Sequence, residues 1–224
     1  MNQATLSIYP WRASIVKKQF MALTGLMMCG FLLIHLAGNL LIFNSPEVFN
    51  QYAFFMLNNP IIMVLEWLLA LLFLFHAVLG LFLIVENLKA RPTRYAVRVT
   101  QEKGSNISFL SMSWTGPLML IFLLLHLLHF KFGTEYWVIQ GDLEIRDLHR
   151  TVAEYFANLI NVLLYSIAML LVALHVQHGV WSAFQSFGFN HPRYNRLLET
   201  GATIYALVIF VGFIAIPLSY VKFW

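Results

Sequence analysis

Residues 161–180 read NVLLYSIAMLLVALHVQHGV, and most of their side chains are apolar. An apolar run of about 20 residues is long enough to cross a bilayer as an α-helix. Two histidines, His175 and His178, lie late in this run. Because an imidazole is costly to place in hydrocarbon, each of them needs a compensating partner. Ionisable residues at such depth are by default candidates for a functional role.

The rest of the chain has the same apolar character. It is 60% hydrophobic and only 11% charged, with a mean hydropathy of +0.73, well outside the range of soluble globular domains. We expect an all-α membrane protein, with one transmembrane domain over residues 1–224 whose helices form a bundle. Five runs are predicted to cross the bilayer, at about 20–43, 60–88, 113–131, 153–183 and 200–222. The first is too long for a signal-peptide core and has no A-x-A cleavage site, so we expect it to be retained.

The positive charges are divided unevenly between the two predicted sides of the membrane. Ten of the 14 lysines and arginines fall on the side of the N-terminus and four on the other. The ten are Arg12, Lys17, Lys18, Lys89, Arg91, Arg94, Arg98, Lys103, Arg193 and Arg196, and the four are Lys131, Arg146, Arg150 and Lys222. Since basic residues accumulate in cytoplasmic connections, we predict a cytoplasmic N-terminus and an external C-terminus. The pI near 9.3 reflects this basic face, and the sequence does not support nucleic-acid binding.

Several kinds of cofactor site are missing from the sequence. Its one cysteine, Cys29, excludes an intrachain disulfide and an iron–sulfur cluster held by this chain alone. No G-x-G-x-x-G pattern and no P-loop occurs. The chain therefore has no evident means of binding a flavin dinucleotide, a soluble nucleotide or a phosphate.

Four of the five predicted helices contain histidine. The six residues are His35, His76, His126, His129, His175 and His178. One buried histidine could simply hydrogen-bond a carbonyl or hydroxyl of a neighbouring helix, but histidines in four helices favour a set of metal ligands. His149 and His191 fall in connections and are expected to be solvated.

Depth sorts four of these histidines into two pairs. A helix rises 1.5 Å per residue, so depth follows from counting residues from the predicted start of each span. This count places His35 and His126 in the outer half of the membrane. His76 and His175 fall at or beyond the midplane on the inner side. Two such pairs suit two haems b, because haem is an apolar disc whose iron takes one ligand on each face. Neutral imidazole is the correct ligand state, and its second nitrogen still needs an acceptor.

Glycines accompany three of these histidines. The pattern H-x-x-x-G occurs at residues 76–80 and 175–179, and residues at this spacing share a helix face. Each glycine would leave a gap for a porphyrin edge, although close packing of helices explains a small residue equally well. Gly38, three residues after His35, offers a similar gap, whereas His126 has no such glycine.

Two other assignments are weaker or stay open. A zinc or iron–carboxylate site fits poorly, because metal-binding carboxylates are missing beside the histidines and the pairs lie at two depths. Glu66, near the start of the second run, suits either a proton relay or a carboxylate at headgroup level beside Trp67.

The chain resembles a known family along nearly its whole length. The segments that carry the likeness are KKQFMALTGLMMCGFLLIHLAGN (17–39), FHAVLGLFL (75–83), LLHLLHF (124–130) and LHVQHGVWSAFQSFG (174–188). The first and last are the most specific. They resemble the cytochrome b membrane anchor of succinate:quinone oxidoreductases and fumarate reductases, in its single-subunit form with five helices and two haems.

This resemblance implies the electron-transfer subunit of a larger complex. Its partners would be an iron–sulfur subunit and a flavoprotein with covalent FAD on the cytoplasmic side, and it would pass electrons between them and quinone, preferably menaquinone. The complex would lie among the lipids of a bacterial cytoplasmic membrane, and no residue of this chain would act on succinate itself. The family's ligand pattern pairs His76 with His175 on the inner haem. It pairs His35 with His126 on the outer haem.

The resemblance leaves some positions unassigned. Ala173 replaces an acidic residue that some members use in moving protons, so a compensating proton path through this position is not supported. The quinone contacts stay open between an outer and an inner group. These are Asn39, Glu47 and Glu66 on the outer rim and Ser182 and Gln185 on the inner one.

Two rival functions remain. The paired histidines also suit a dihaem cytochrome b of a formate dehydrogenase, a hydrogenase or a b561-type reductase, which leaves the likeness at residues 182–188 unexplained. A transporter or proton channel with histidine relays is the second, and the lack of evident inverted repeats speaks against it.

As iron ligand, His175 is preferred to His178, which is expected to contact a haem propionate or a partner subunit. In the same way, His126 is preferred to His129.

Overall fold

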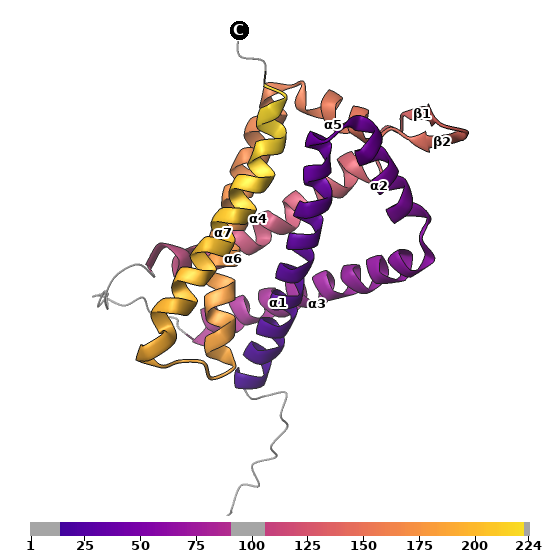
Figure 1. The fold of residues 1–224 in the computed structure, drawn as a ribbon. Helices are drawn as coiled ribbons and strands as arrows, with labels where there is room; N and C mark the ends of the chain where they lie inside the picture. Colours follow the sequence, from indigo (N-terminus) through magenta and orange to yellow (C-terminus); the bar gives the residue numbers. More distant parts are fainter. Residues whose placement is uncertain (1–13, 91–105, 222–224) are drawn as a thin grey trace, which may run out of the picture.

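The computed structural model describes residues 14–90 and 106–221, and its main feature is a set of five long helices (Figure 1). These are α1 (Ser14–Leu40), α3 (Pro60–Ala90), α4 (Asn106–Phe130), α6 (Leu159–Ser186) and α7 (Pro192–Ser219). Each contains a segment long and apolar enough to cross a membrane. The prediction of five helices with the length and composition of membrane spans is therefore confirmed within the described residues.

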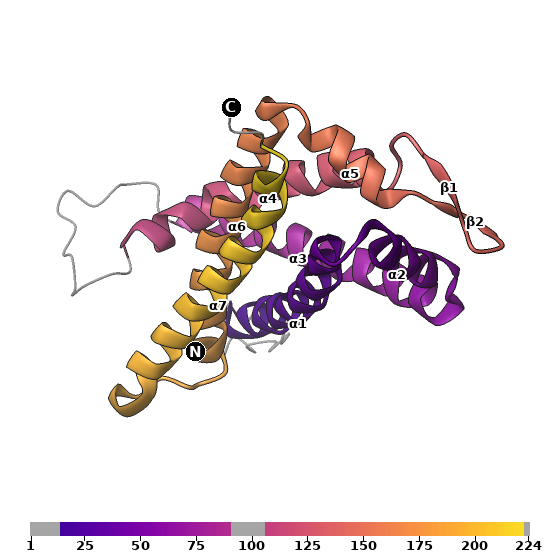
Figure 2. The same ribbon diagram turned by 45° about the horizontal axis from the view of Figure 1, so that its top comes forward.

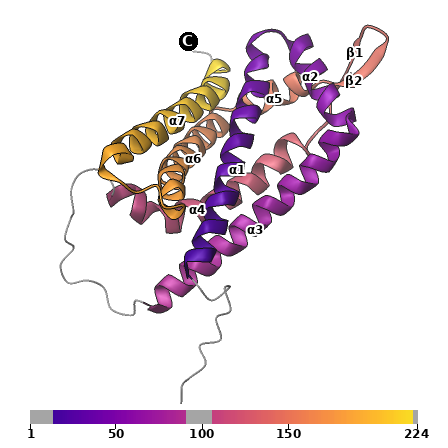
Figure 3. The ribbon, with the colours of Figure 1, turned by 60° about the horizontal axis from the view of Figure 1, so that its bottom comes forward.

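Helix α6 lies at the centre of the arrangement, where it packs against α7, α1 and α4. α6 and α7 run side by side, whereas α3 runs obliquely to α1 and lies to one side of the other helices (Figures 2 and 3). The start of α1 and the end of α7 lie at opposite ends of the molecule (Figure 1). An odd number of spans requires this, whereas the side of the membrane on which each terminus lies stays a prediction.

Two apolar clusters follow each other along α6 and hold the bundle together. The first gathers Leu36, Ala168, Met169, Val172, Val176, Ala206 and Ile209, and the second gathers Ile42, Phe49, Val152, Phe156, Val162, Tyr165 and Ile216. Small residues at the α6–α7 contact, such as Ala168 and Ala206, let the two backbones approach closely. Since lipid tails are as apolar as these side chains, close packing stabilises the contact more than removal from water does.

The connections at one end contain more structure than the sequence predicted. After a 3-10 turn, η2 (Leu41–Phe43), the first connection forms α2 (Pro46–Asn58). The third forms a hairpin of β1 (Trp137–Gln140) and β2 (Leu143–Arg146), followed by α5 (Leu148–Phe156). We name these elements the cap. Figure 1 places α2, α5 and the hairpin together at the end of the molecule where α7 finishes.

The predicted start of the fourth span, residue 153, is wrong. α5 and α6 are separate helices, because the side chain of Asn158 begins a new one by accepting a hydrogen bond from the Ile160 amide at 2.9 Å. The apolar residues Tyr155 and Phe156 of α5 extend the hydrophobic run in the sequence without belonging to the spanning helix. α6 therefore begins at Leu159.

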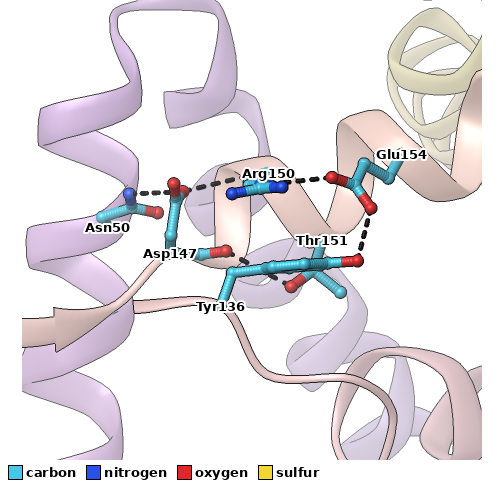
Figure 4. A network of polar contacts seen from close by, with 6 residues as sticks. All are labelled: Asn50, Tyr136, Asp147, Arg150, Thr151 and Glu154. Carbon is cyan, nitrogen blue, oxygen red and sulfur yellow. Dashed lines mark hydrogen bonds and ion pairs between the residues drawn. The ribbon is translucent and has the colours of Figure 1, made fainter. Parts of the chain in front are cut away.

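A polar network ties α2 to α5 within the cap (Figure 4). Asn50, only 3% exposed, donates to Asp147 Oδ1 at 2.9 Å, and its own Oδ1 accepts from the His149 amide at 2.9 Å. Asp147 also caps α5 by accepting from the Arg150 amide at 3.0 Å. Because the buried amide of Asn50 has partners on both sides, we expect it to fix α2 against the start of α5.

The exposed side of the same network is centred on Glu154. Its carboxylate accepts hydrogen bonds from the Tyr136 hydroxyl and from Arg150 Nε, the latter at 2.8 Å (Figure 4). These two hydrogen bonds hold the pKa of Glu154 below its usual range. The network joins the segment before β1 to α5 on the surface of the cap.

Some of the residues that predicted the orientation in the membrane are not placed. Arg12, Arg91, Arg94, Arg98, Lys103 and Lys222 lie outside the described residues. The cytoplasmic position of the N-terminus therefore stays a prediction from the distribution of charge.

Candidate functional site

His35 on α1 and His126 on α4 meet between their helices, and we call them the outer pair. Their ring centres are 5.9 Å apart and the ring planes are nearly perpendicular, at 85°. Two imidazoles on opposite faces of one iron have ring centres roughly 6 Å apart, given metal–imidazole bonds of about 2 Å. The separation of the outer pair therefore fits a shared haem iron.

Aromatic side chains surround the outer pair. Phe31 stacks on His35 with ring centres 5.2 Å apart, and Phe122 and Phe130 lie 5.8 and 5.3 Å from His126. Nδ1 of His126 is buried and has no hydrogen-bond partner within the described part of the chain. A buried nitrogen without a partner is unfavourable. The outer pair therefore lies in an apolar, aromatic surrounding of the kind that suits the flat apolar face of a haem.

His76 on α3 and His175 on α6, the inner pair, are each held by a threonine of another helix. Nδ1 of His76 lies 2.9 Å from Thr24 Oγ1 on α1, and Nδ1 of His175 lies 3.1 Å from Thr115 Oγ1 on α4. Both threonines are buried, at 5% and 3% exposure. Each inner histidine is therefore hydrogen-bonded to a helix other than its own, His76 of α3 to α1 and His175 of α6 to α4.

The bond between Thr24 and His76 has a defined direction. Thr24 Oγ1 also lies 2.9 Å from the Phe20 carbonyl oxygen, which can only accept. A hydroxyl carries a single hydrogen, so Thr24 donates to Phe20 and accepts from the Nδ1–H of His76. In that tautomer the other ring nitrogen, Nε2, keeps a free lone pair, which is the state that binds a metal.

The helix bounds refine the two depths. His76 follows the start of α3 at Pro60 by 16 residues, and His175 follows the start of α6 at Leu159 by the same number. The two histidines are thus equally far along their helices, as expected for residues grouped as one inner pair. The outer pair is near the opposite ends of its helices, with His126 four residues before the end of α4 at Phe130.

An internal repeat, overlooked in the sequence, explains how α1 and α4 serve both pairs. Residues 24–35 read TGLMMCGFLLIH and residues 115–126 read TGPLMLIFLLLH. Seven of the 12 positions are identical: the threonine, the glycine, the second methionine of the first segment, the phenylalanine, two leucines and the histidine. Eleven residues are close to three helical turns, so each threonine and histidine share one face, roughly 16 Å apart. This pattern was the signal that could have identified the threonines.

The glycine after each threonine lets the inner histidine approach. A Cβ on Gly25 would lie 3.3 Å from Cε1 of His76, and one on Gly116 would lie 3.7 Å from Cε1 of His175. The first distance is tighter than an ordinary van der Waals contact, whereas the second is ordinary. The two copies of the repeat therefore place a glycine against an inner histidine in the same way, but the contact at Gly25 is closer than the contact at Gly116.

The structure bears differently on the three gaps predicted beside the histidines. The prediction of a gap at Gly38 is wrong, because the Tyr52 ring of α2 fills this space and a Cβ on Gly38 would lie 2.6 Å from Tyr52 Cε1. At Gly80 a Cβ would meet the end of the Met21 side chain at 3.1 Å. Only at Gly179, among these three, is the space open to 4 Å. The porphyrin interpretation of the glycines therefore keeps support at Gly179 alone.

The neighbouring histidines take different positions. His129 lies against Tyr155, with ring centres 4.5 Å apart, and its Nδ1 is buried without a hydrogen-bond partner in the described residues. His178 lies 6.3 Å from Trp181 by the same measure. The ring contact between His35 and His126 favours His126 over His129 as the member of the outer pair.

The candidate quinone residues are spread over the molecule. Glu66 forms an ion pair with Lys131, which links α3 to the end of α4. Asn39 lies against the outer pair, and its side-chain amide donates to the His35 carbonyl at 2.8 Å. Glu47 stands in the first turn of α2. Ser182 accepts at its carbonyl from the Ser186 hydroxyl at 3.0 Å near the opposite end of α6. No quinone pocket is assigned from these positions.

Comparison with known families agrees with the first half of this site. Residues 2–101 match the family described as succinate dehydrogenase/fumarate reductase transmembrane subunit. Neither the search of curated proteins nor the search of solved structures found a match. The matched stretch contains Thr24 with one histidine of each pair, His35 and His76. This match covers 100 of the 224 residues, and over that stretch the chain is similar to succinate dehydrogenase and fumarate reductase transmembrane subunits.

Proposed function

We propose that this chain is the cytochrome b membrane anchor of a succinate:quinone oxidoreductase, as a single subunit with two haems b. The observation that carries the proposal is the arrangement of four histidines from four helices in two pairs at two depths. His35 and His126 would hold the outer haem iron. His76 and His175 would hold the inner one.

The residues of the chain have distinct tasks in this proposal. When bound, the two haems would supply one-electron redox chemistry between the soluble subunits and quinone. The four neutral imidazoles would hold the two haem irons, and burial among aromatic and aliphatic side chains would keep water away from them. Thr24 holds His76 in the tautomer that a metal requires.

The partners follow from what the chain lacks. A single cysteine and the absence of a dinucleotide motif leave the iron–sulfur clusters and the FAD to other subunits. We propose that an iron–sulfur subunit and a flavoprotein bind at the end where α1 begins. This end carries Lys17, Lys18, Lys89, Arg193 and Arg196. A cytoplasmic location of this end in a bacterial inner membrane, menaquinone as the electron carrier and a single domain over residues 1–224 are parts of the same proposal.

The proposal is tested by purifying the tagged chain from membranes of its own organism under mild detergent. We expect a flavoprotein and an iron–sulfur protein to co-purify, and a b-type signal to appear in the reduced-minus-oxidised visible spectrum. A molybdenum or nickel subunit in place of the flavoprotein would assign the chain to another respiratory complex. The absence of any b-type signal from the intact complex would exclude the cytochrome function.

A further inference from the structure

We infer that Thr24 and Thr115 are positioning residues for the inner haem, each fixing one axial histidine through its Nδ1 hydrogen and making that ligand more electron-rich. The inference rests on the proposed function, since it presumes that His76 and His175 bind iron. It adds two residues, from two further helices, that touch the ligands and not the iron.

The geometry at both threonines supports this role. The Oγ1–Nδ1 distances, 2.9 and 3.1 Å, are those of good hydrogen bonds. Both bonds cross between helices, from α1 to α3 and from α4 to α6. Because the threonines are almost completely buried, water does not compete for the imidazole. Loss of the Thr24 hydroxyl would leave the Nδ1–H of His76 without an acceptor, and the same would hold at Thr115 when Nε2 of His175 binds iron.

The internal repeat makes the two threonines equivalent. Each stands 11 residues before an outer histidine and directly before a glycine that makes room for the inner histidine. Ordinary helix packing requires a small residue at such a contact but not a hydroxyl at both positions. The hydroxyl on the same face as the ligand in both copies indicates a shared task at the inner level.

The outer pair has no equivalent acceptor in the described residues. Nδ1 of His126 lacks a hydrogen-bond partner. Beside His35 the nearest polar group is Asn39 Nδ2, 3.4 Å from both ring nitrogens. An amide nitrogen donates and cannot accept from an imidazole N–H. The threonine effect should therefore be confined to the inner haem, and the outer haem supplies an internal control.

The direction of the effect follows from the chemistry of the ligand. An acceptor on the non-coordinating nitrogen raises the basicity of an imidazole. A more basic ligand stabilises ferric over ferrous iron, which lowers the reduction potential. Removing a hydroxyl should therefore raise the midpoint potential of the inner haem, or release that haem if the histidine turns away.

The experiment compares Thr24→Val and Thr115→Val with Thr24→Ser and Thr115→Ser in the intact purified complex. Valine keeps the shape and removes the acceptor, whereas serine keeps the hydroxyl. Redox titration and low-temperature electron paramagnetic resonance report on each haem separately. We expect the valine variants to raise the midpoint potential of the inner haem or to lose that haem. The serine variants should behave like the wild type, and the outer haem should stay unchanged in all four. Thr151→Val, a buried threonine in α5, is the matched control and should leave both haems unaltered.

Each other result points to a specific error. Wild-type midpoints and signals in both valine variants would overturn the threonine inference and leave the proposed function standing. Equal loss of the inner haem with valine and with serine would also overturn it, because a steric effect would then explain the result. A change at the outer haem alone would show that the threonines act on the outer pair and that their assignment to the inner pair is wrong. A wild-type complex without two b-type haems would instead refute the proposed function.

Discussion

The inner and outer histidine pairs differ in what holds each imidazole. The inner histidines are each fixed by a threonine hydroxyl from another helix. The outer histidines contact each other and lie among phenylalanines, and one of them has a buried nitrogen without a partner. One pair is thus oriented by hydrogen bonds and the other by packing. Helices α1 and α4 serve both pairs, because each carries an inner threonine and an outer histidine on one face.

This difference shows how two similar sites can be built from one repeated segment. Residues 24–35 and 115–126 each contribute to both levels, while α3 and α6 each contribute a single inner histidine. The repeated helices therefore hold the two levels roughly 16 Å apart. A change at one end of the repeat should leave the site at the other end intact.

The largest expected effect is the loss of one haem when a histidine of either pair is removed. His76→Ala or His175→Ala should remove the inner haem and keep the outer one, because each ligand pair is separate. His35→Ala should do the converse. Haem content per chain, measured as the pyridine haemochrome, should fall to about half of the wild-type value.

The neighbouring histidines are the matched controls for these variants. His178→Ala and His129→Ala should both keep two haems. If His178→Ala removed a haem and His175→Ala did not, the assignment of the inner pair would be wrong. If His129→Ala removed the outer haem and His126→Ala did not, the outer pair would need the same revision.

A smaller effect should distinguish alanine substitutions at the equivalent glycines of the two repeat copies. Gly25→Ala would press a methyl group against His76, whereas Gly116→Ala would make only ordinary contact with His175. We therefore expect Gly25→Ala to shift the signal of the inner haem and Gly116→Ala to leave it almost unchanged. Optical and electron paramagnetic resonance spectra of the two variants make the comparison. The reverse order would show that the two contacts are not placed as described.

The cap should affect the outer pair before the inner pair. Asn50→Ala removes a buried amide with partners on both α5 and the residue before it, and this should cost about 1–3 kcal/mol of stability. On heating, the variant should lose its outer haem at a lower temperature than the wild type, with the inner haem less affected. Asn58→Ala is the control, because Asn58 is exposed and bonds only within its own helix, to the Phe54 carbonyl. Equal behaviour of the two variants would contradict the role given to Asn50.

The smallest effect concerns pH and the surface of the cap. Hydrogen bonds from Tyr136 and Arg150 lower the pKa of Glu154 in the folded protein. Its contribution to stability is therefore present above the unfolded pKa and is lost as the pH falls through the folded pKa. Because the group is exposed, the contribution is small. Glu154→Gln should lower the thermal midpoint slightly at neutral pH and not at acidic pH, and a difference that persists in acid would rule out this explanation.

Much of the fold could be predicted from hydrophobic run length. Five apolar runs predicted five helices because a bilayer demands about 20 apolar residues from each. The start of α6 was misplaced because Tyr155 and Phe156 continue the apolar run, and only Asn158 marks the break between two helices. α2 and the hairpin were missed because short elements in a connection have no such length requirement.

The grouping of the histidines could be predicted from the sequence better than the residues that hold them. Depth alone sorted the histidines, since depth follows from counting residues along a helix. Thr24 was missed because its partner His76 is 52 positions away in the chain and comes close only through packing. Gly38 was misinterpreted for a similar reason, because Tyr52 of the unforeseen α2 fills the space beside it.

The central claim is that this one chain holds two b-type haems in two separate histidine pairs. The most direct test is a haem-to-protein ratio for the wild-type complex together with a redox titration. The account predicts two haems b per chain and two resolved components, of which only one responds to Thr24→Val. A ratio of one or less, or a single component that responds to substitutions at both pairs, would contradict it.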